Sequence, residues 1–183
     1  MTKKSKNPVV QQFVDGLQES LDKTAKAFGL SVAQMEEVRN ALLSGVPMYQ
    51  ILNIKESVIQ ARYALAYQLY TSGQLEKAEN LFRWLCSYSN IDVANWMGLG
   101  ACRQAQKNYE GAMEAYQMAA LYGALEDPAP FFYCGICLLK LQKKDDAKVA
   151  MQTVLTLGDT SNSEHKVIMD KAAEMLLLIE KGA

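Results

Sequence analysis

A sequence repeat with a period of 34 residues is the feature that most restricts how this chain can fold. When residues 59–92 are aligned with residues 93–126, apolar residues of similar size fall on one another. The matched pairs are Leu65 with Leu99, Ala66 with Gly100, Ala78 with Ala112, and Phe82 with Tyr116. A third unit begins at Pro128, one residue late, and supplies Gly135, Ala147 and Met151 at the same offsets. A period of this length predicts an array of stacked structural units.

The second unit reads Trp96-x-x-Leu99-Gly100 and then Ala112-x-x-x-Tyr116, which resembles the tetratricopeptide repeat, a pair of antiparallel helices. Small residues let the paired helices approach, and large apolar residues fill the space beside them. The large residues expected in the core are Leu65, Phe82, Leu99, Tyr116 and Met151. One unit cannot bury its apolar face alone, so the units stack. We therefore predict an all-α fold with three tetratricopeptide repeats in a short right-handed superhelix.

The repeats divide the chain into three parts. Residues 1–54 are predicted to form N-terminal helices, residues 55–158 the repeats, and residues 161–183 a C-terminal capping helix. The individual repeats are predicted at 59–92, 93–126 and 128–160. The pattern Ser31-x-x-Gln34 is typical of a capping box that opens a helix, and Ser161-x-x-Glu164 predicts the start of the last one.

The first N-terminal helix, expected over residues 8–28, is amphipathic. Its apolar face includes Phe13, Val14, Leu17 and Leu21. This face either packs back on the first repeat or forms a homodimer contact, and composition alone does not separate the two.

A candidate binding surface follows from the first helix of each repeat, which lines the concave side in this architecture. Three inward offsets recur in each unit at helical spacing. They hold Tyr63, Tyr67 and Tyr70, then Met97, Ala101 and Gln104, and finally Phe132, Ile136 and Leu139. None of these residues is charged, whereas a solvated stripe ordinarily is. An apolar, aromatic surface of this kind predicts a protein partner, and tyrosine suits such contacts. The alternative is that some of these residues are core.

Composition excludes several classes of function. The formal net charge is -1, and nucleic-acid binding needs concentrated positive charge. No secretory signal or run of 18 apolar residues is present, so we expect no stable membrane insertion. The four cysteines are expected to be reduced and to pack as small hydrophobes. A single histidine and the absence of catalytic motifs predict no metal, no cofactor and no enzymatic activity.

Several longer runs resemble the class II chaperones of bacterial type III secretion, of the LcrH/SycD/IpgC type. The runs are Phe82-Arg83-x-Leu85-Cys86, Trp96-Met97-Gly98-Leu99-Gly100, Asp127-Pro128-x-Pro130-x-Phe132, and Gly45-Val-Pro-Met-Tyr-Gln-Ile51. Together the resemblance covers residues 35–157. The leader before it and the tail after it are longer than is usual for that family.

The resemblance implies a cytoplasmic chaperone of the two hydrophobic translocators that form the secretion pore. It implies that a client segment with a P-x-L-x-x-P type motif lies extended in the groove. It also implies homodimers through residues 8–54 and, for some members, a transcriptional activator as partner. The competing hypotheses are a generic tetratricopeptide adaptor or scaffold and, without residue evidence, an enzyme. A scaffold for charged C-terminal tails would line its groove with Lys, Arg and Asn, which the inward offsets lack.

Overall fold

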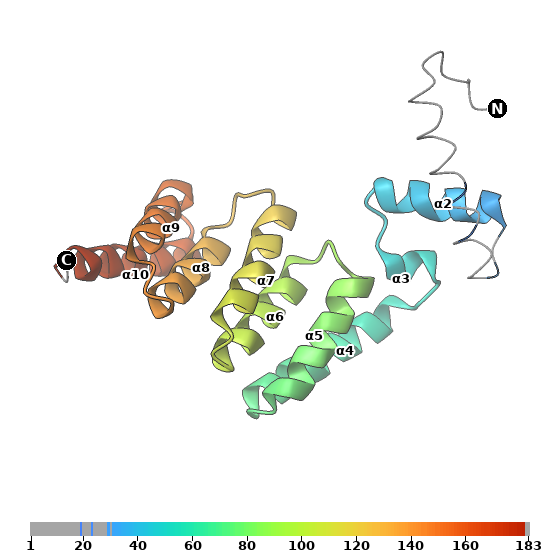
Figure 1. Cartoon of the computed structure of the whole chain (residues 1–183), viewed down its shortest axis with the longest axis horizontal. Helices are drawn as coiled ribbons and strands as arrows, with labels where there is room; N and C mark the ends of the chain where they lie inside the picture. Colours follow the sequence, from blue (N-terminus) through green and yellow to red (C-terminus); the bar gives the residue numbers. More distant parts are fainter. Residues whose placement is uncertain (1–18, 20–22, 24–28, 30, 182–183) are drawn as a thin grey trace, which may run out of the picture. The chain divides into compact units, whose positions relative to one another are not determined.

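The computed structural model describes residues 19, 23, 29 and 31–181, whose regular elements are helices with no strand among them (Figure 1). The chain divides into two compact units, Met1–Val46 and Pro47–Ala183. The apolar residues predicted on the first N-terminal helix, Phe13, Val14, Leu17 and Leu21, lie outside the described residues. The prediction of an all-helical repeat fold is confirmed.

The described part of the first unit contains helix α2 (Val32–Leu43), and the predicted capping box opens it. The backbone nitrogen of Ser31 donates to Gln34 Oε1 at 2.9 Å, and the nitrogen of Gln34 donates to Ser31 Oγ at 3.3 Å. Two of the amide groups at the start of the helix therefore find partners locally. Gly45, with φ of +76°, takes the chain out of the helix, because glycine adopts this conformation without steric cost.

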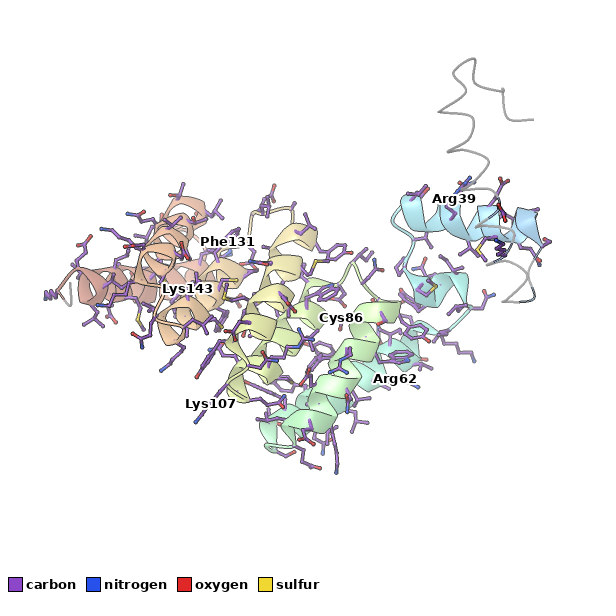
Figure 2. All side chains as sticks on the ribbon, viewed as in Figure 1. Arg39, Arg62, Cys86, Lys107, Phe131 and Lys143 are labelled. Carbon is purple, nitrogen blue, oxygen red and sulfur yellow. The ribbon has the colours of Figure 1, made fainter. Side chains whose placement is uncertain are left out.

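The second unit consists of a short helix and three antiparallel helix pairs followed by a last helix. The elements are α3 (Met48–Ile51), α4 (Glu56–Thr71), α5 (Leu75–Tyr88), α6 (Val93–Ala105), α7 (Tyr109–Tyr122), α8 (Pro128–Lys140), α9 (Lys144–Leu157) and α10 (Ser163–Lys181). Each of these long helices packs on the next along the chain, and α10 packs on both α9 and α8. Lys107 and Lys143 lie in the turns that close the second and third pairs (Figure 2).

Aspartate side chains cap the starts of α6 and α8. Asp92 accepts from the backbone nitrogen of Ala94 at 3.0 Å, and Asp127 accepts from that of Ala129 at 2.8 Å. Pro128 occupies the first position of α8, where a missing N–H costs nothing. The third start differs: Asn162, not Ser161, caps α10, because Asn162 Oδ1 accepts from the nitrogen of Glu164 at 2.9 Å. Ser161 Oγ instead donates to Asp159.

The core follows the repeat, with one correction. The small residues at the closest helix approaches are all buried: Ala66, Ala78, Gly100, Ala112, Gly135 and Ala147. Phe82, Leu99, Tyr116 and Met151 are also buried, as predicted. Leu65 was expected in the core but is 47% exposed. Its counterpart Leu99 packs against the preceding repeat, whereas no repeat precedes α4 within the second unit.

A polar network ties the first two repeats together at the position where Arg103 replaces the usual tyrosine. Arg103 Nε lies 3.2 Å from Glu79 Oε1 on α5, and Arg103 Nη1 donates to the carbonyl of Gly111 at 2.8 Å. Gln106 Nε2 and Arg83 Nη2 also donate to Glu79, at 2.8 and 2.9 Å. The carboxylate thereby joins α5 to α6, and the guanidinium joins α6 to α7.

Helix α10 completes the C-terminal end of the core. Ala172 is fully buried in one cluster with Phe132, Met151 and Val154. Ile168, Met169, Met175 and Leu176 of α10 pack on the same cluster. Within the described residues, no helix is both long enough and apolar enough to cross a membrane.

Candidate functional site

A cavity of about 620 Å³ opens between the helices of the three repeats. Its wall comes from the first helix of each pair, α4, α6 and α8, with additions from α5 and α7. The lining residues are Tyr63, Tyr67, Tyr70, Phe82, Ala94, Met97, Gly98, Ala101, Gln104, Ala105, Tyr109, Tyr116, Tyr133 and Lys140. This is the size and apolar character of a site for a small molecule or for several residues of a peptide.

Six of the nine residues predicted for client contact line this cavity. They are Tyr63, Tyr67 and Tyr70 of α4 and Met97, Ala101 and Gln104 of α6. Tyr67 is 57% exposed, while its neighbours on the stripe are half-buried. The helical spacing of the inward offsets therefore brings residues from two successive repeats to one surface.

The other three predicted residues lie elsewhere. Phe132 is buried in the C-terminal core cluster, and Ile136 and Leu139 pack against that cluster. The physical reason is α10, which packs on α8 and α9 and adds its own apolar face to this cluster. In the third repeat, Phe132 is thus part of the core, whereas Ile136 and Leu139 are half-buried beside it and their contact with a client stays a prediction.

Several lining residues were not predicted from the sequence. Tyr133 and Lys140 represent the third repeat, and each lies one position beyond a predicted inward residue. Tyr133 and Lys140 align with Gly98 and Ala105, which also line the cavity, at a shift of 35 residues. The repeat alignment therefore related these two pairs of lining residues to each other. Tyr109 and Tyr116 come from α7, the second helix of its pair, which the offset rule did not consider.

Close packing fixes the aromatic wall. The rings of Tyr63 and Phe82 meet edge to face at 5.8 Å, and those of Tyr116 and Tyr133 stack at 5.4 Å. Glycines make room for two of these rings: a Cβ atom at Gly98 would overlap Phe82, and one at Gly100 would overlap Tyr116. Aromatic pairs in these geometries add to the stability gained from burial alone.

The cavity is nearly neutral. Lys140 is the one charged residue that lines it, and it forms no ion pair among the described residues. Burial raises the pKa of Tyr63 and of Tyr70, so both hydroxyls stay protonated at neutral pH. The hydroxyl of Tyr116 donates to Gln104 Oε1 at 2.8 Å. Apolar faces with scattered hydroxyls suit an extended peptide, which offers both apolar side chains and backbone polar groups.

The four cysteines and the single histidine do not line the cavity. Burial raises the pKa of Cys86 and Cys134 to about 12, and that of Cys102 and Cys137 to about 11. Thiols with such pKa values are poor nucleophiles at neutral pH. His165 Nδ1 accepts from the backbone nitrogen of Asp159 at 3.3 Å and does not line the cavity. Among the described residues, no group of three or more metal-ligating side chains is found.

Comparisons with known proteins agree with this architecture. The sequence profile of the tetratricopeptide repeat matches residues 63–90 and 93–124. The chaperone protein SicA of Salmonella dublin is 30% identical over 119 residues, which is 65% of this chain and 72% of SicA. The low calcium response locus protein H of Yersinia pestis is 30% identical over 141 residues, covering 76% of this chain and 83% of that protein.

A solved structure gives the same fold. The Yersinia enterocolitica type III secretion chaperone SycD, crystallised with a peptide of the translocator YopD, superposes with a TM-score of 0.66 at 29% identity. The superposition covers 70% of this chain and 97% of that chain.

Proposed function

This chain belongs to the family of type III secretion translocator chaperones, and from that premise we propose that it binds translocators in the bacterial cytoplasm. It keeps these hydrophobic clients soluble and competent for secretion. It does so by holding an extended client segment in the aromatic cavity. The relatives are chaperones and not enzymes, and we propose that this chain likewise acts by binding alone.

The observation that carries the proposal is the cavity itself. Its wall is aromatic and apolar and runs over three consecutive repeats, and Lys140 is the one charged side chain among the described residues that line it. A translocator segment destined for a membrane is rich in apolar side chains, which such a wall shields from water. An adaptor for acidic C-terminal tails would need several cationic residues around one carboxylate, and a lone lysine does not provide that.

We propose that Tyr63, Tyr67, Tyr70, Met97, Ala101 and Gln104 contact the client directly. The client motif expected from the family resemblance is of the P-x-L-x-x-P type, whose prolines favour an extended conformation. Homodimer formation through residues 8–54 stays a prediction, since Phe13, Val14, Leu17 and Leu21 lie outside the described residues. A transcriptional activator as partner also stays a prediction.

The test is fluorescence polarisation with labelled P-x-L-x-x-P peptides from candidate translocators. We expect wild-type binding in the micromolar range, on the order of -8 kcal/mol. The Tyr67→Ala, Met97→Ala double variant should bind at least about tenfold more weakly, because buried aromatic contacts dominate such interfaces. Tyr67 is exposed in the free protein, so its truncation leaves the core intact.

The matched control is Leu121→Ala, which removes an exposed apolar side chain (60% exposed) outside the cavity. This variant should bind like the wild type. If the double variant keeps full affinity, the client does not lie in this cavity. If the folded wild type binds none of the peptides, and full-length translocators stay insoluble when coexpressed with it, the chaperone function itself is wrong.

A further inference from the structure

One side chain that lines the cavity carries an amide nitrogen with no hydrogen-bond partner among the described residues. Gln104, on α6, is half-buried and lines the cavity. Its Oε1 accepts from the hydroxyl of Tyr116 at 2.8 Å. A glutamine amide has one carbonyl acceptor and an NH2 group with two donors. With the oxygen engaged, the nitrogen Nε2 is left for the cavity.

The Gln104 nitrogen is accessible as well as unpaired. No described residue accepts a hydrogen bond from Nε2. The one buried side-chain nitrogen or oxygen atom without a partner in the described part of the chain is Asn95 Oδ1, so Nε2 of Gln104 is in contact with solvent. Because Gln104 lines the cavity, its solvent-accessible amide nitrogen offers two protons for a ligand to accept.

Tyr116 holds the amide in this orientation. Its side chain is 1% exposed, stacks on Tyr133 and occupies space that Gly100 leaves open. Burial raises the pKa of Tyr116, so its hydroxyl remains protonated and keeps its proton to donate. The hydroxyl donates to Gln104 from a ring that is almost fully buried, so Tyr116 lines the cavity but offers a bound client little surface of its own.

We propose that Gln104 sets the register of the bound client by donating from Nε2 to a backbone carbonyl, and that Tyr116 is the positioning residue for this contact. This inference rests on the proposed function. The free tyrosine hydroxyls of the wall rotate and either donate or accept, so they tolerate many registers. The Gln104 nitrogen only donates, and it is fixed in place.

A donor of this kind matches an extended, proline-containing segment. Proline has no backbone N–H, and the extended conformation that it favours leaves its carbonyls without internal partners. Such a segment presents acceptors in excess of donors. Gln104 satisfies one of these carbonyls, which would otherwise lose its hydrogen bond to water on entering the cavity.

The experiment measures the Kd of a proline-containing translocator peptide for the wild type, Gln104→Met, Tyr116→Phe and the double variant. We expect about a fivefold loss in each single variant, the size of one neutral hydrogen bond. The double variant should be no weaker than Gln104→Met, because Tyr116 acts only through Gln104. Gln117→Met is the control, since Gln117 is exposed on α7 outside the cavity, and it should bind like the wild type.

A second variant guards against misfolding. Gln104→Glu keeps an oxygen acceptor for Tyr116 and removes the donor, so it too should bind weakly.

A series of peptides, each with one backbone ester that weakens a single carbonyl acceptor, locates the contact. At one position the ester should weaken binding to the wild type and leave binding to Gln104→Met unchanged. Wild-type affinity in Gln104→Met or Tyr116→Phe, or additive losses in the double variant, would overturn the inference and leave the function standing. Failure of the wild type to bind would overturn the proposed function first.

Discussion

At the scale of single residues, glycines decide where the aromatic rings of the cavity lie. Gly100 sits in the middle of α6, where glycine ordinarily costs about 0.5–1 kcal/mol relative to alanine. Here a Cβ atom would overlap the ring of Tyr116, which is buried and cannot move aside. Glycine at this position therefore serves the packing of α6 on α7 and not the helix itself.

We accordingly expect Gly100→Ala to destabilise the protein by about 1–3 kcal/mol, the usual cost of overpacking a core. The measurement is the urea midpoint or the Tm, compared with the wild type. Helix propensity alone predicts the opposite sign, so a higher Tm would show that the Tyr116 ring relaxes easily and that α6 and α7 do not need this close approach.

At the scale of helices, the Glu79 carboxylate joins the first two repeats, and its ionisation links their stability to pH. Burial alone would raise the pKa of Glu79, but hydrogen bonds from Arg83, Gln106 and Arg103 outweigh it and lower the pKa below its ordinary value of 4.5. A carboxyl with a lowered pKa stabilises the fold above its unfolded pKa. That contribution is lost as the pH falls through the folded pKa.

We expect Glu79→Gln to lower the free energy of unfolding by about 1–2 kcal/mol at pH 7, because charge-assisted hydrogen bonds become neutral ones. The deficit should shrink as the pH falls from 4.5 through the lower pKa of Glu79 in the folded protein, because the wild-type carboxyl then also becomes neutral. Urea unfolding across pH 3–7 measures both effects. Glu76→Gln, in the exposed first turn of the same helix, is the control and should be neutral. A deficit that does not change with pH would mean that Glu79 stabilises the fold through packing and hydrogen-bond geometry, and not through its negative charge.

At the scale of the whole molecule, the repeat period predicts most of the architecture and part of the site. The period fixes which helix face turns inward, so Tyr63, Tyr67 and Met97 were predictable from spacing alone. It does not say what lies beyond the last repeat. Phe132 has the same offset as Met97, yet Phe132 is buried in the core cluster that α10 completes. Because α10 lies outside the repeat pattern, the period alone could not predict this burial. The contact between Tyr116 and Gln104 joins two helices and has no spacing signature.

The stability of the third repeat depends on α10, the helix that follows the repeats. Each helix of the second unit packs mainly on its neighbours, so damage at one end reaches the adjacent repeat first. Two substitutions to Glu on α10 distinguish the effect of a buried charge from the effect of Glu on the helix itself. Ala172 is fully buried in the C-terminal cluster, whereas Leu178 is 65% exposed. Ala172→Glu places an unpaired carboxylate among apolar side chains. Leu178→Glu places the same group in water.

We expect Ala172→Glu to cost more than about 3 kcal/mol and Leu178→Glu to stay within about 0.5 kcal/mol of the wild type. Hydrogen exchange gives the more specific readout, because it reports protection helix by helix. In Ala172→Glu, the amides of α8 and α9 should lose protection while those of α4 and α5 keep it, so the tyrosines of α4 would stay in place as the third repeat loosens. Equal loss of protection from α4 to α9 would instead show that the three repeats unfold as one cooperative unit and that α10 stabilises the distant half of the cavity as strongly as the near half.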